Sequence, residues 1–173
     1  VGNVLQPPDD AVGILPHLLK LAADHFPGGN IGVMATPMTL REEKFSELLH
    51  RCGEHAHVTL LPAPEIVELV EAGKGDSPEM DVLLQKLLGS YRGKLDAVVL
   101  GCTHYPFASA AISRVLGAHT VLLDGGEGTA RETERRLAAA NLLEHGEGSL
   151  LVENSRKDRK IIDLCYSLLG MKE

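Results

Sequence analysis

The chain has 173 residues, enough for one ordinary domain or for one domain and part of another, and its 44% hydrophobic and 24% charged residues are typical of a soluble globular protein. A net charge of −7, an aromatic content of 3% and the absence of tryptophan argue against nucleic acid or an acidic membrane surface as the main partner. Three widely spaced cysteines indicate a reducing cytoplasm rather than a disulfide framework. We expect no signal peptide, because the N-terminus lacks a charged head followed by an apolar core. We also expect no membrane span, because no apolar run approaches roughly 18 residues.

Apolar residues recur along the chain with helical spacing in some segments and in short continuous runs in others. Pro16 is placed to begin the first helix, Gly53 to end the second and Ser77 to cap a later one. In chain order the pattern predicts a helix over 16–26, a strand over 30–35, a helix over 40–52, a strand over 58–61, helices over 64–72 and 77–88, a strand over 95–101, a helix over 106–116, a strand over 120–123, a helix over 129–143, a weak strand over 149–152 and a final helix over 157–169.

The alternation of strands and helices predicts an α/β fold on a doubly wound parallel sheet. Residues 9–124 are expected to form one compact α/β unit. Residues 1–8 and 125–173 are expected to be remnant pieces of a second unit, too few for a full sheet. The glycine-rich corner 124–128 between them resembles a phosphate loop, but it lacks the lysine of a P-loop and its two acids would repel phosphate, so we interpret it as a hinge.

Cys102 stands where the strand over 95–101 ends and a helix is predicted to begin. Ligands of parallel α/β sheets bind beyond the carboxyl ends of the strands, and a following helix start favours a thiolate. His104, two residues further on, could assist this thiol as an acid or base, or as a nucleophile. The alternatives are that Cys102 is a small buried apolar residue and that His104 only caps the next helix.

The other two thiols are placed differently. Cys52 falls at the C-terminal end of a predicted helix, which leads to the opposite edge of the sheet, and Cys165 lies in an apolar helical stretch that we expect in the core. The histidines near Cys52 (His50, His55 and His57) match no paired zinc signature, and a helix C-terminus already favours histidine. We therefore expect one reactive thiol and no metal site.

Thr36 and Thr39 lie in the loop that leaves the strand over 30–35, on the same rim of the sheet as Cys102. Their hydroxyls could bind a carboxylate or could cap the helix that follows, and the sequence leaves both alternatives open. Glu71, near the end of a short predicted helix, is on its own an ordinary surface charge.

The run Leu-Gly-Cys-Thr-His-Tyr-Pro over 100–106 resembles the second cysteine motif of the glutamate racemases, in the aspartate/glutamate racemase superfamily. Segments 31–39, 66–73 and 122–130 are similar, in order and spacing, to that family's threonine loop, glutamate helix and crossing back to the first domain. The resemblance covers nearly the whole chain. Its most specific part is the cysteine motif, because related aspartate and hydantoin racemases carry other residues in place of His-Tyr-Pro.

The resemblance implies a cofactor-independent enzyme that interconverts L- and D-glutamate, supplies D-glutamate for the bacterial cell wall and commonly forms homodimers. Two cysteines act on opposite faces of the substrate Cα, because a single base tends to restore the original hand. On this resemblance Cys102 is one of the two bases and His104 assists it. Thr103 and His104 contact the substrate. Glu71 matches an acidic residue near the pocket.

The chain departs from the family in its N-terminal part. The family's Asp-Ser motif after the first strand, its Tyr-Gly pair and its first cysteine in a Cys-Asn-Thr stretch are not in this sequence. Ala63-Pro64 stands where the family often has Cys-Pro, and Met38 stands where it has glycine. We therefore expect the chain to be the C-terminal two-thirds of a racemase, with the second base outside this sequence.

Two other functions stay open. The chain could be a catalytically inactive binding or interaction module that keeps half a pocket. It could also be a Cys-His hydrolase working through a covalent acyl-enzyme, although the sequence shows no third group to orient the imidazole.

Overall fold

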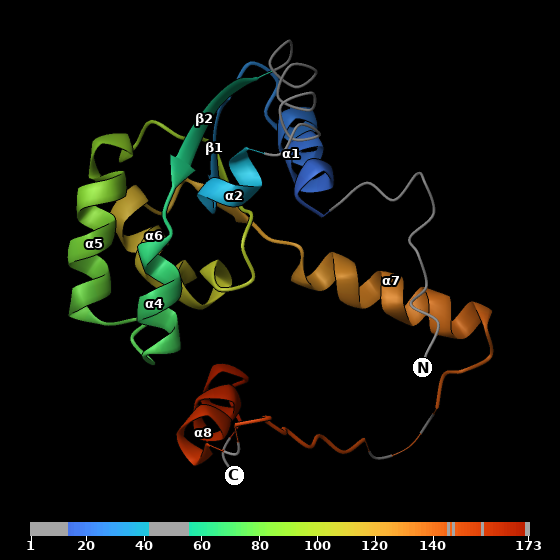
Figure 1. The fold of residues 1–173 in the computed structure, drawn as a ribbon. Coiled ribbons are helices and arrows are strands. Elements are labelled where there is room, and N and C mark those ends of the chain that lie inside the picture. Colours follow the sequence, from blue (N-terminus) through green and yellow to red (C-terminus); the bar gives the residue numbers. More distant parts are fainter. Residues whose placement is uncertain (1–13, 42–55, 145, 147, 157, 172–173) are drawn as a thin grey trace.

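The computed structural model describes residues 14–41, 56–144, 146, 148–156 and 158–171 (Figure 1). Four strands form one parallel sheet in the order β2-β1-β3-β4: β1 (Asn30–Ala35), β2 (His57–Pro62), β3 (Ala97–Leu100) and β4 (Val121–Leu123). The strand order reverses between β1 and β3, because β2 lies on one side of this pair and β4 on the other. This arrangement confirms the predicted α/β fold with a parallel sheet.

Helices cover both faces of the sheet, as a doubly wound fold requires (Figure 1). The helices are α1 (Ile14–His25), α2 (Pro37–Leu40), α4 (Glu65–Glu71), α5 (Pro78–Leu88), α6 (Ser109–Leu116), α7 (Gly126–Ala139) and α8 (Arg159–Leu168), with 3-10 turns η1 (Gly89–Tyr91) and η2 (Tyr105–Ala108). In the part of the chain that the structure describes, no helix is both long and apolar enough to cross a membrane.

The sheet separates two apolar cores, and the alternation of side chains along its central strands assigns residues to each. Ile31, Val33 and Val99 pack with α1 on one face. Val98 and Leu100 belong to the larger core on the other face, which α4, α5 and α6 complete. All four residues of β3 are buried, so the strand that leads to Cys102 is fixed from both sides.

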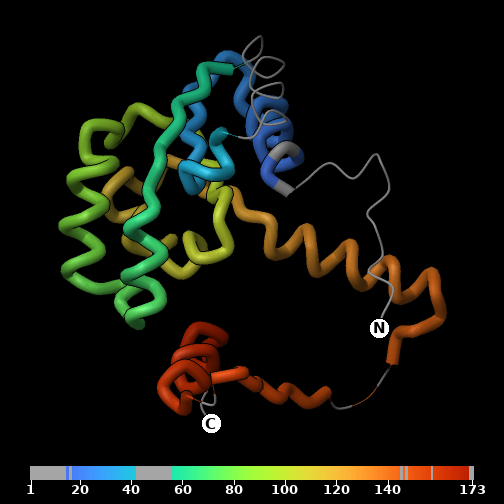
Figure 2. The backbone as a smooth tube through the Cα atoms, viewed as in Figure 1, coloured from blue at the N-terminus to red at the C-terminus, as the bar shows by residue number. Residues whose placement is uncertain are grey.

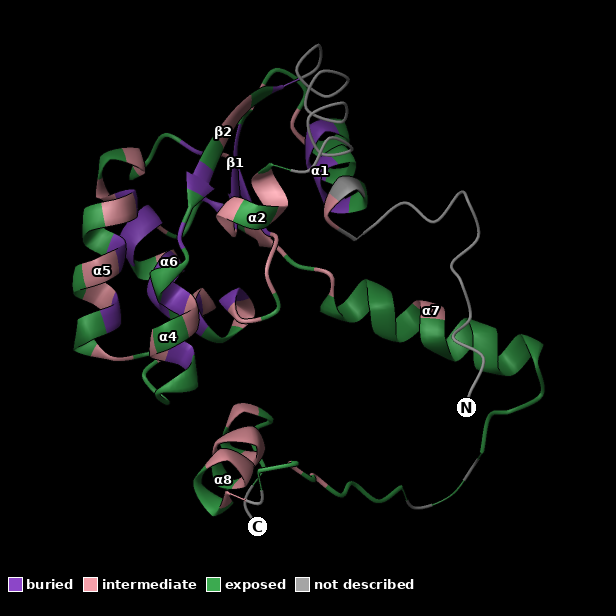
Figure 3. Cartoon of the chain, in the orientation of Figure 1, coloured by how far each residue is buried: buried purple, intermediate pink, exposed green. Residues whose placement is uncertain are grey.

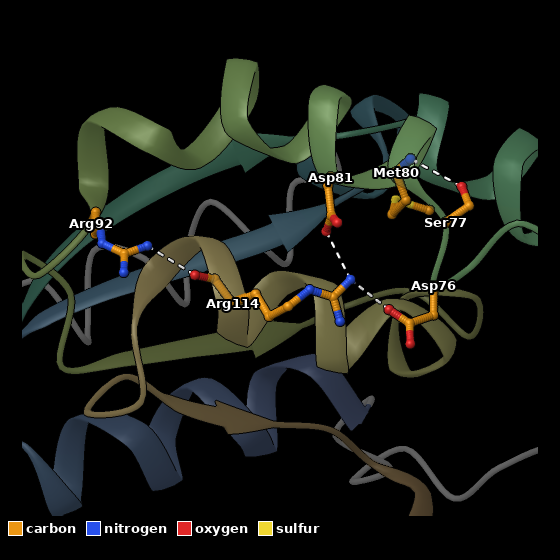
Figure 4. A network of polar contacts seen from close by, with 6 residues as sticks. All are labelled: Asp76, Ser77, Met80, Asp81, Arg92 and Arg114. Atoms are coloured by element: carbon orange, nitrogen blue, oxygen red, sulfur yellow. Dashed lines mark hydrogen bonds and ion pairs between the residues drawn. The ribbon is translucent and has the colours of Figure 1, made fainter.

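A polar network on the surface ties the helices of the larger core together (Figure 4). Ser77 caps α5 by accepting the backbone N–H of Met80 at 3.2 Å. Arg114 of α6 reaches Asp76 at 2.6 Å and Asp81 at 2.8 Å, so it bridges α6 to the start of α5. These two carboxylates raise the pKa of Arg114 above its ordinary value, mainly through their hydrogen bonds.

After β4 the chain runs away from the sheet and its two cores (Figure 2). No residue of α7 is buried, and the segment after it is mostly exposed (Figure 3). The weak strand predicted over 149–152 is wrong: these residues form no strand, because no neighbouring strand offers them a hydrogen-bond ladder. The helix predicted over 129–143 begins earlier, at Gly126, so Gly126 and Gly128 lie in the first turn of α7, where the Asp124 carboxylate accepts the Gly126 N–H at 2.8 Å.

The remaining elements match the prediction within a few residues, with two qualifications. The helix predicted over 106–116 is a 3-10 turn followed by the shorter α6. Most of the helix predicted over 40–52, with Cys52 and the residues around it, lies outside the described residues.

Candidate functional site

The candidate site lies at the carboxyl ends of β1 and β3, where the strand order reverses. Met34 pairs with Leu100 in the parallel register, and the backbone N–H of Gly101 donates to the Met34 carbonyl at 2.7 Å. Thr36 and Cys102 each follow these paired residues by two positions, so the two exit loops leave the sheet side by side. A reversal of strand order opens a crevice between such loops, and this is where ligands of doubly wound sheets bind.

Cys102, His104 and Glu71 form a chain of polar contacts at this edge of the sheet. The Sγ of Cys102 lies 3.8 Å from Nδ1 of His104, and Nε2 of His104 lies 3.1 Å from Oε1 of Glu71. The structure therefore brings Glu71, the last residue of α4, to a motif 33 positions away in the sequence. With Nε2–H donating to the carboxylate, Nδ1 is the acceptor that faces the thiol.

This arrangement suits proton transfer from a thiol. If the Cys102 proton moves to Nδ1, a thiolate forms next to an imidazolium whose other N–H faces the Glu71 carboxylate. Cys102 is partly buried, the His104 side chain is 31% exposed and the Glu71 side chain is 66% exposed. Solvent therefore reaches the Glu71 end of the chain of contacts, whereas the thiol lies closer to the sheet.

Of the predicted threonines, Thr103 lies beside His104, whereas Thr36 and Thr39 lie at α2. The Thr103 hydroxyl lies 3.5 Å from Nδ1 of His104, the same atom that faces the thiol. Thr36 caps the four-residue α2, with its Oγ1 3.4 Å from the backbone nitrogen of Thr39 and 3.1 Å from the Thr39 hydroxyl. The capping alternative for Thr36 is therefore realised, on the rim that also carries Cys102.

The expectation that a helix start would act directly on Cys102 is wrong. The residues after His104 form the 3-10 turn η2, and α6 begins at Ser109, seven positions beyond the thiol. The neighbouring imidazole, rather than a helix dipole, is therefore the group placed to act on the thiol.

A cavity of about 430 Å³ opens beside His104, and α8 forms its other wall. The lining residues are Glu71, Thr103, His104, Phe107, Ile161, Leu164, Cys165 and Leu168. The prediction that Cys165 lies in the core is therefore wrong: this thiol is partly exposed and faces the cavity. The apolar residues of α8 at helical spacing form the face that closes the cavity, a pattern that the sequence carries but that does not say what the face covers.

Tyr105 is the buried polar group beneath the thiol loop, and the sequence patterns did not single it out. Its side chain is fully buried, and its hydroxyl donates to the Ala63 carbonyl at 2.9 Å. Burial raises the pKa of the phenol above its usual range, and the nearby Cys102 and Glu65 add to this. The phenol therefore stays protonated and acts as a donor.

Within the described ranges, no group of three or more His, Cys, Asp or Glu side chains is placed to hold a metal ion. Of the residues weighed as a metal cluster, His57 is an exposed residue of β2, and the other three lie outside the described residues.

Comparison with known proteins gives a consistent result, although no family model matches the chain. The chain is 40% identical to a glutamate racemase of Clostridium botulinum over 161 residues, which are 91% of this chain and 62% of that protein. The crystal structure of Escherichia coli glutamate racemase with L-glutamate and the activator UDP-MurNAc-Ala matches with a TM-score of 0.64 and 32% identity, over 73% of this chain and 48% of that one. Francisella tularensis glutamate racemase with D-glutamate shares the fold with a TM-score of 0.67 and 20% identity, over 91% of this chain and 60% of that one. The chain thus spans about three-fifths of the length of the clostridial relative.

Proposed function

We propose that this chain, which is homologous to glutamate racemases over about nine-tenths of its length, carries one half of an active site that interconverts L- and D-glutamate. The observation that carries the proposal is the chain of contacts from Cys102 through His104 to Glu71 at the crevice of the sheet. A thiol needs such a partner, because the thiolate rather than the thiol is the base.

In this proposal the Cys102 thiolate removes the Cα proton of glutamate. The Cα–H bond breaks, an S–H bond forms, and the electron pair of the broken bond passes into the α-carboxylate. His104 has first taken the thiol proton at Nδ1, and Glu71 stabilises the imidazolium through Nε2–H. A second thiol then returns a proton from the opposite face. We expect that thiol in the part of a racemase that this chain does not span, and the scheme needs no cofactor.

Thr103, Thr36 and Thr39 are the proposed contacts for the substrate carboxylates. Support comes from the side-by-side exit of the two loops and from the place of Thr103 on the cavity wall. Hydroxyls at this rim can donate to a carboxylate without adding charge next to the thiolate.

Exchange of the Cα proton tests the proposal. The chain is incubated with L- or D-glutamate in heavy water, and loss of the Cα proton is followed by NMR. We expect slow exchange that Cys102→Ala abolishes. The matched control is Cys165→Ala, which removes the other described thiol and should leave most of the exchange.

A second readout is independent of turnover. Glutamate bound at the crevice should slow alkylation of Cys102 by iodoacetamide, and an amino acid such as lysine should not. A folded chain that shows neither exchange nor protection of Cys102 contradicts the proposal and favours the alternative of an inactive interaction module.

The wider context is proposed from the same homology. We propose that the whole enzyme supplies D-glutamate for the cell wall from the cytoplasm and works as a homodimer. We also propose that residues 9–124 form the second racemase domain and that residues 1–8 and 125–173 belong to the first. The lack of any buried residue in α7 supports this division, because a helix of a complete domain buries one face.

The Cys-His hydrolase is a second candidate, because the structure supplies the orienting group that the sequence did not show. Glu71 contacts His104 as the third member of a catalytic triad does. An activated ester distinguishes the two functions: a hydrolase accumulates an acyl group on Cys102, visible as a gain in intact mass, and then releases it. A racemase site reacts stoichiometrically at most and shows no turnover of the ester.

A further inference from the structure

We propose that Tyr105 is a positioning residue that holds the Cys102–His104 loop and the Glu71 helix in register, so that the thiol, the imidazole and the carboxylate stay aligned. This inference rests on the proposed function for its catalytic meaning. Its structural content, that the phenol controls the environment of Cys102, can be tested without any substrate.

Tyr105 joins the two segments that build the site. Its backbone N–H donates to the Cys102 carbonyl at 3.2 Å, so the phenol is attached directly to the turn that carries the thiol. Its hydroxyl crosses the core to the Ala63 carbonyl, 42 residues earlier in the chain. Ala63 lies immediately before Pro64, the cap of α4, and α4 ends at Glu71.

Residues of one loop therefore hold both ends of α4. Tyr105 fixes the residue before its start, and His104 contacts its last residue at 3.1 Å. A seven-residue helix rises by about 1.5 Å per residue and transmits a shift at one end to the other. A change at Ala63 is thus expected to move the Glu71 carboxylate relative to the imidazole.

Filling the core does not by itself require the hydroxyl of Tyr105. A phenylalanine ring would fill the same volume without burying a hydroxyl, which is unfavourable unless the hydroxyl is bonded. The Ala63 carbonyl also accepts the Ile66 N–H, at 3.3 Å. The phenol is therefore not required to satisfy this carbonyl, and Tyr105→Phe should fold.

The test is the pH profile of Cys102 alkylation by iodoacetamide, measured by mass spectrometry on the folded chain. The thiol contacts His104, and His104 contacts Glu71. The phenol lies near the thiol and also near Glu65. We expect Tyr105→Phe and Glu71→Gln each to move the midpoint of the profile upward by about half a pH unit or more, because both weaken the cationic form of His104 next to the thiol.

The double variant Tyr105→Phe with Glu71→Gln should shift the midpoint no further than Glu71→Gln alone, because both changes act through one contact. Tyr166→Phe is the matched control. It removes a phenol on α8 whose oxygen lies 3.4 Å from the Val152 nitrogen, and it should leave the profile unchanged.

A profile of Tyr105→Phe that matches the wild type, even with a lower melting temperature, would show that Tyr105 only fills the core. Additive shifts in the double variant would also overturn the inference. Pro64→Gly provides an independent check if Tyr105→Phe does not fold: it keeps the phenol but loosens the start of α4, and it should move the midpoint in the same direction. Absence of both glutamate exchange and protection of Cys102 by glutamate, alongside these shifts, would reject the proposed function and leave the positioning role intact.

Discussion

Gly101 lies between β3 and the reactive loop, where the backbone packs tightly against its surroundings. A Cβ at this position would lie 2.8 Å from Cδ1 of Leu15, 3.0 Å from the Met34 carbonyl oxygen and 3.2 Å from Cβ of Ala35. Leu15 can rotate away, but the carbonyl belongs to β1 and accepts the hydrogen bond from Gly101 itself. Close approach of the two exit loops therefore depends on the missing side chain.

We predict that Gly101→Ala lowers the free energy of unfolding by about 1–3 kcal/mol, the usual range for overpacking a core. It should also change the alkylation rate of Cys102, because the thiol follows directly. Urea denaturation and alkylation kinetics measure the two effects. The control is Gly128→Ala in α7, where a Cβ meets nothing within 4 Å and alanine should stabilise the helix by up to about 1 kcal/mol. Equal effects of the two substitutions would contradict this account.

Some residues of the site could be predicted from the sequence and others could not, for a physical reason. Cys102 and His104 could be found together because they are two positions apart in one turn after a buried strand. The partner role of Glu71 could not be derived, since its contact with His104 depends on the tertiary placement of α4; only the family resemblance singled it out. The role of Tyr105 could not be predicted from a polar pattern in the sequence, because its hydroxyl donates to a backbone carbonyl in the core.

At the scale of an element, the end of α6 shows how its last carbonyls are satisfied. The final four C=O groups of a helix lack intrahelical partners. Here the Gly117 N–H donates to the Ser113 carbonyl, and the Gly93 N–H donates to the Leu116 carbonyl. Arg92 donates through Nη1 to the remaining two carbonyls: that of Arg114 at 2.9 Å (Figure 4) and that of Val115 at 2.9 Å.

We predict that Arg92→Ala destabilises the protein by about 1–2 kcal/mol, because it removes a charged donor shared by two carbonyls. Arg131→Ala is a suitable comparison, since Arg131 pairs with the exposed Glu127 on α7 and its loss should change stability by less than about 0.5 kcal/mol. Thermal unfolding of both variants gives the measurement. An Arg92 variant as stable as the wild type would show that water satisfies these carbonyls equally well.

The helix α7 depends on charge rather than on burial. Glu132 receives hydrogen bonds from Arg135 and Arg136, which lower its pKa from 4.5 to about 2. Because the pKa in the folded state is below the ordinary value, the stabilisation is present above pH 4.5 and is lost as the pH falls through about 2.

We therefore predict that Glu132 titrates near pH 2 and that α7 loses helicity there, as followed by carboxyl and Cα chemical shifts. Glu132→Gln should remove this transition and make α7 less helical at neutral pH. Titration of Glu132 near 4.5 would mean that the arginine contacts are not formed in solution.

The strands of the main sheet could be predicted because each is a short buried apolar run, and burial on both faces leaves that signature. The segment 149–152 is similarly apolar, yet it forms no strand. A strand needs a neighbour to complete its hydrogen bonds, and that information lies outside the segment. The same limit explains why the face covered by α8 could not be read from its spacing.

At the scale of the whole molecule, apolar exposure is concentrated near the C-terminus. More than half of the large exposed apolar side chains that the structure describes fall between residues 137 and 171, including Leu142, Leu150 and Leu151. Exposed apolar side chains that gather into a large patch on a soluble protein often mark an interface.

We predict that the isolated chain self-associates through this region in a concentration-dependent way. Replacing Leu150 and Leu151 together by serine should shift sedimentation toward the monomer and leave the far-ultraviolet spectrum unchanged. Val82→Ser, on the exposed face of α5, is the control and should not alter the association. A chain that is monomeric at high concentration would contradict this prediction.

The central position of β3 sets how the molecule opens. Every residue of β3 is buried, β1 and β4 pair with it on its two sides, and both cores press on it. Its amide hydrogens should therefore exchange with heavy water only when the entire domain unfolds, whereas those of α7 should exchange through small local openings. Transient fraying of α8 would then open the cavity beside His104 repeatedly without displacing the strand that precedes the reactive loop.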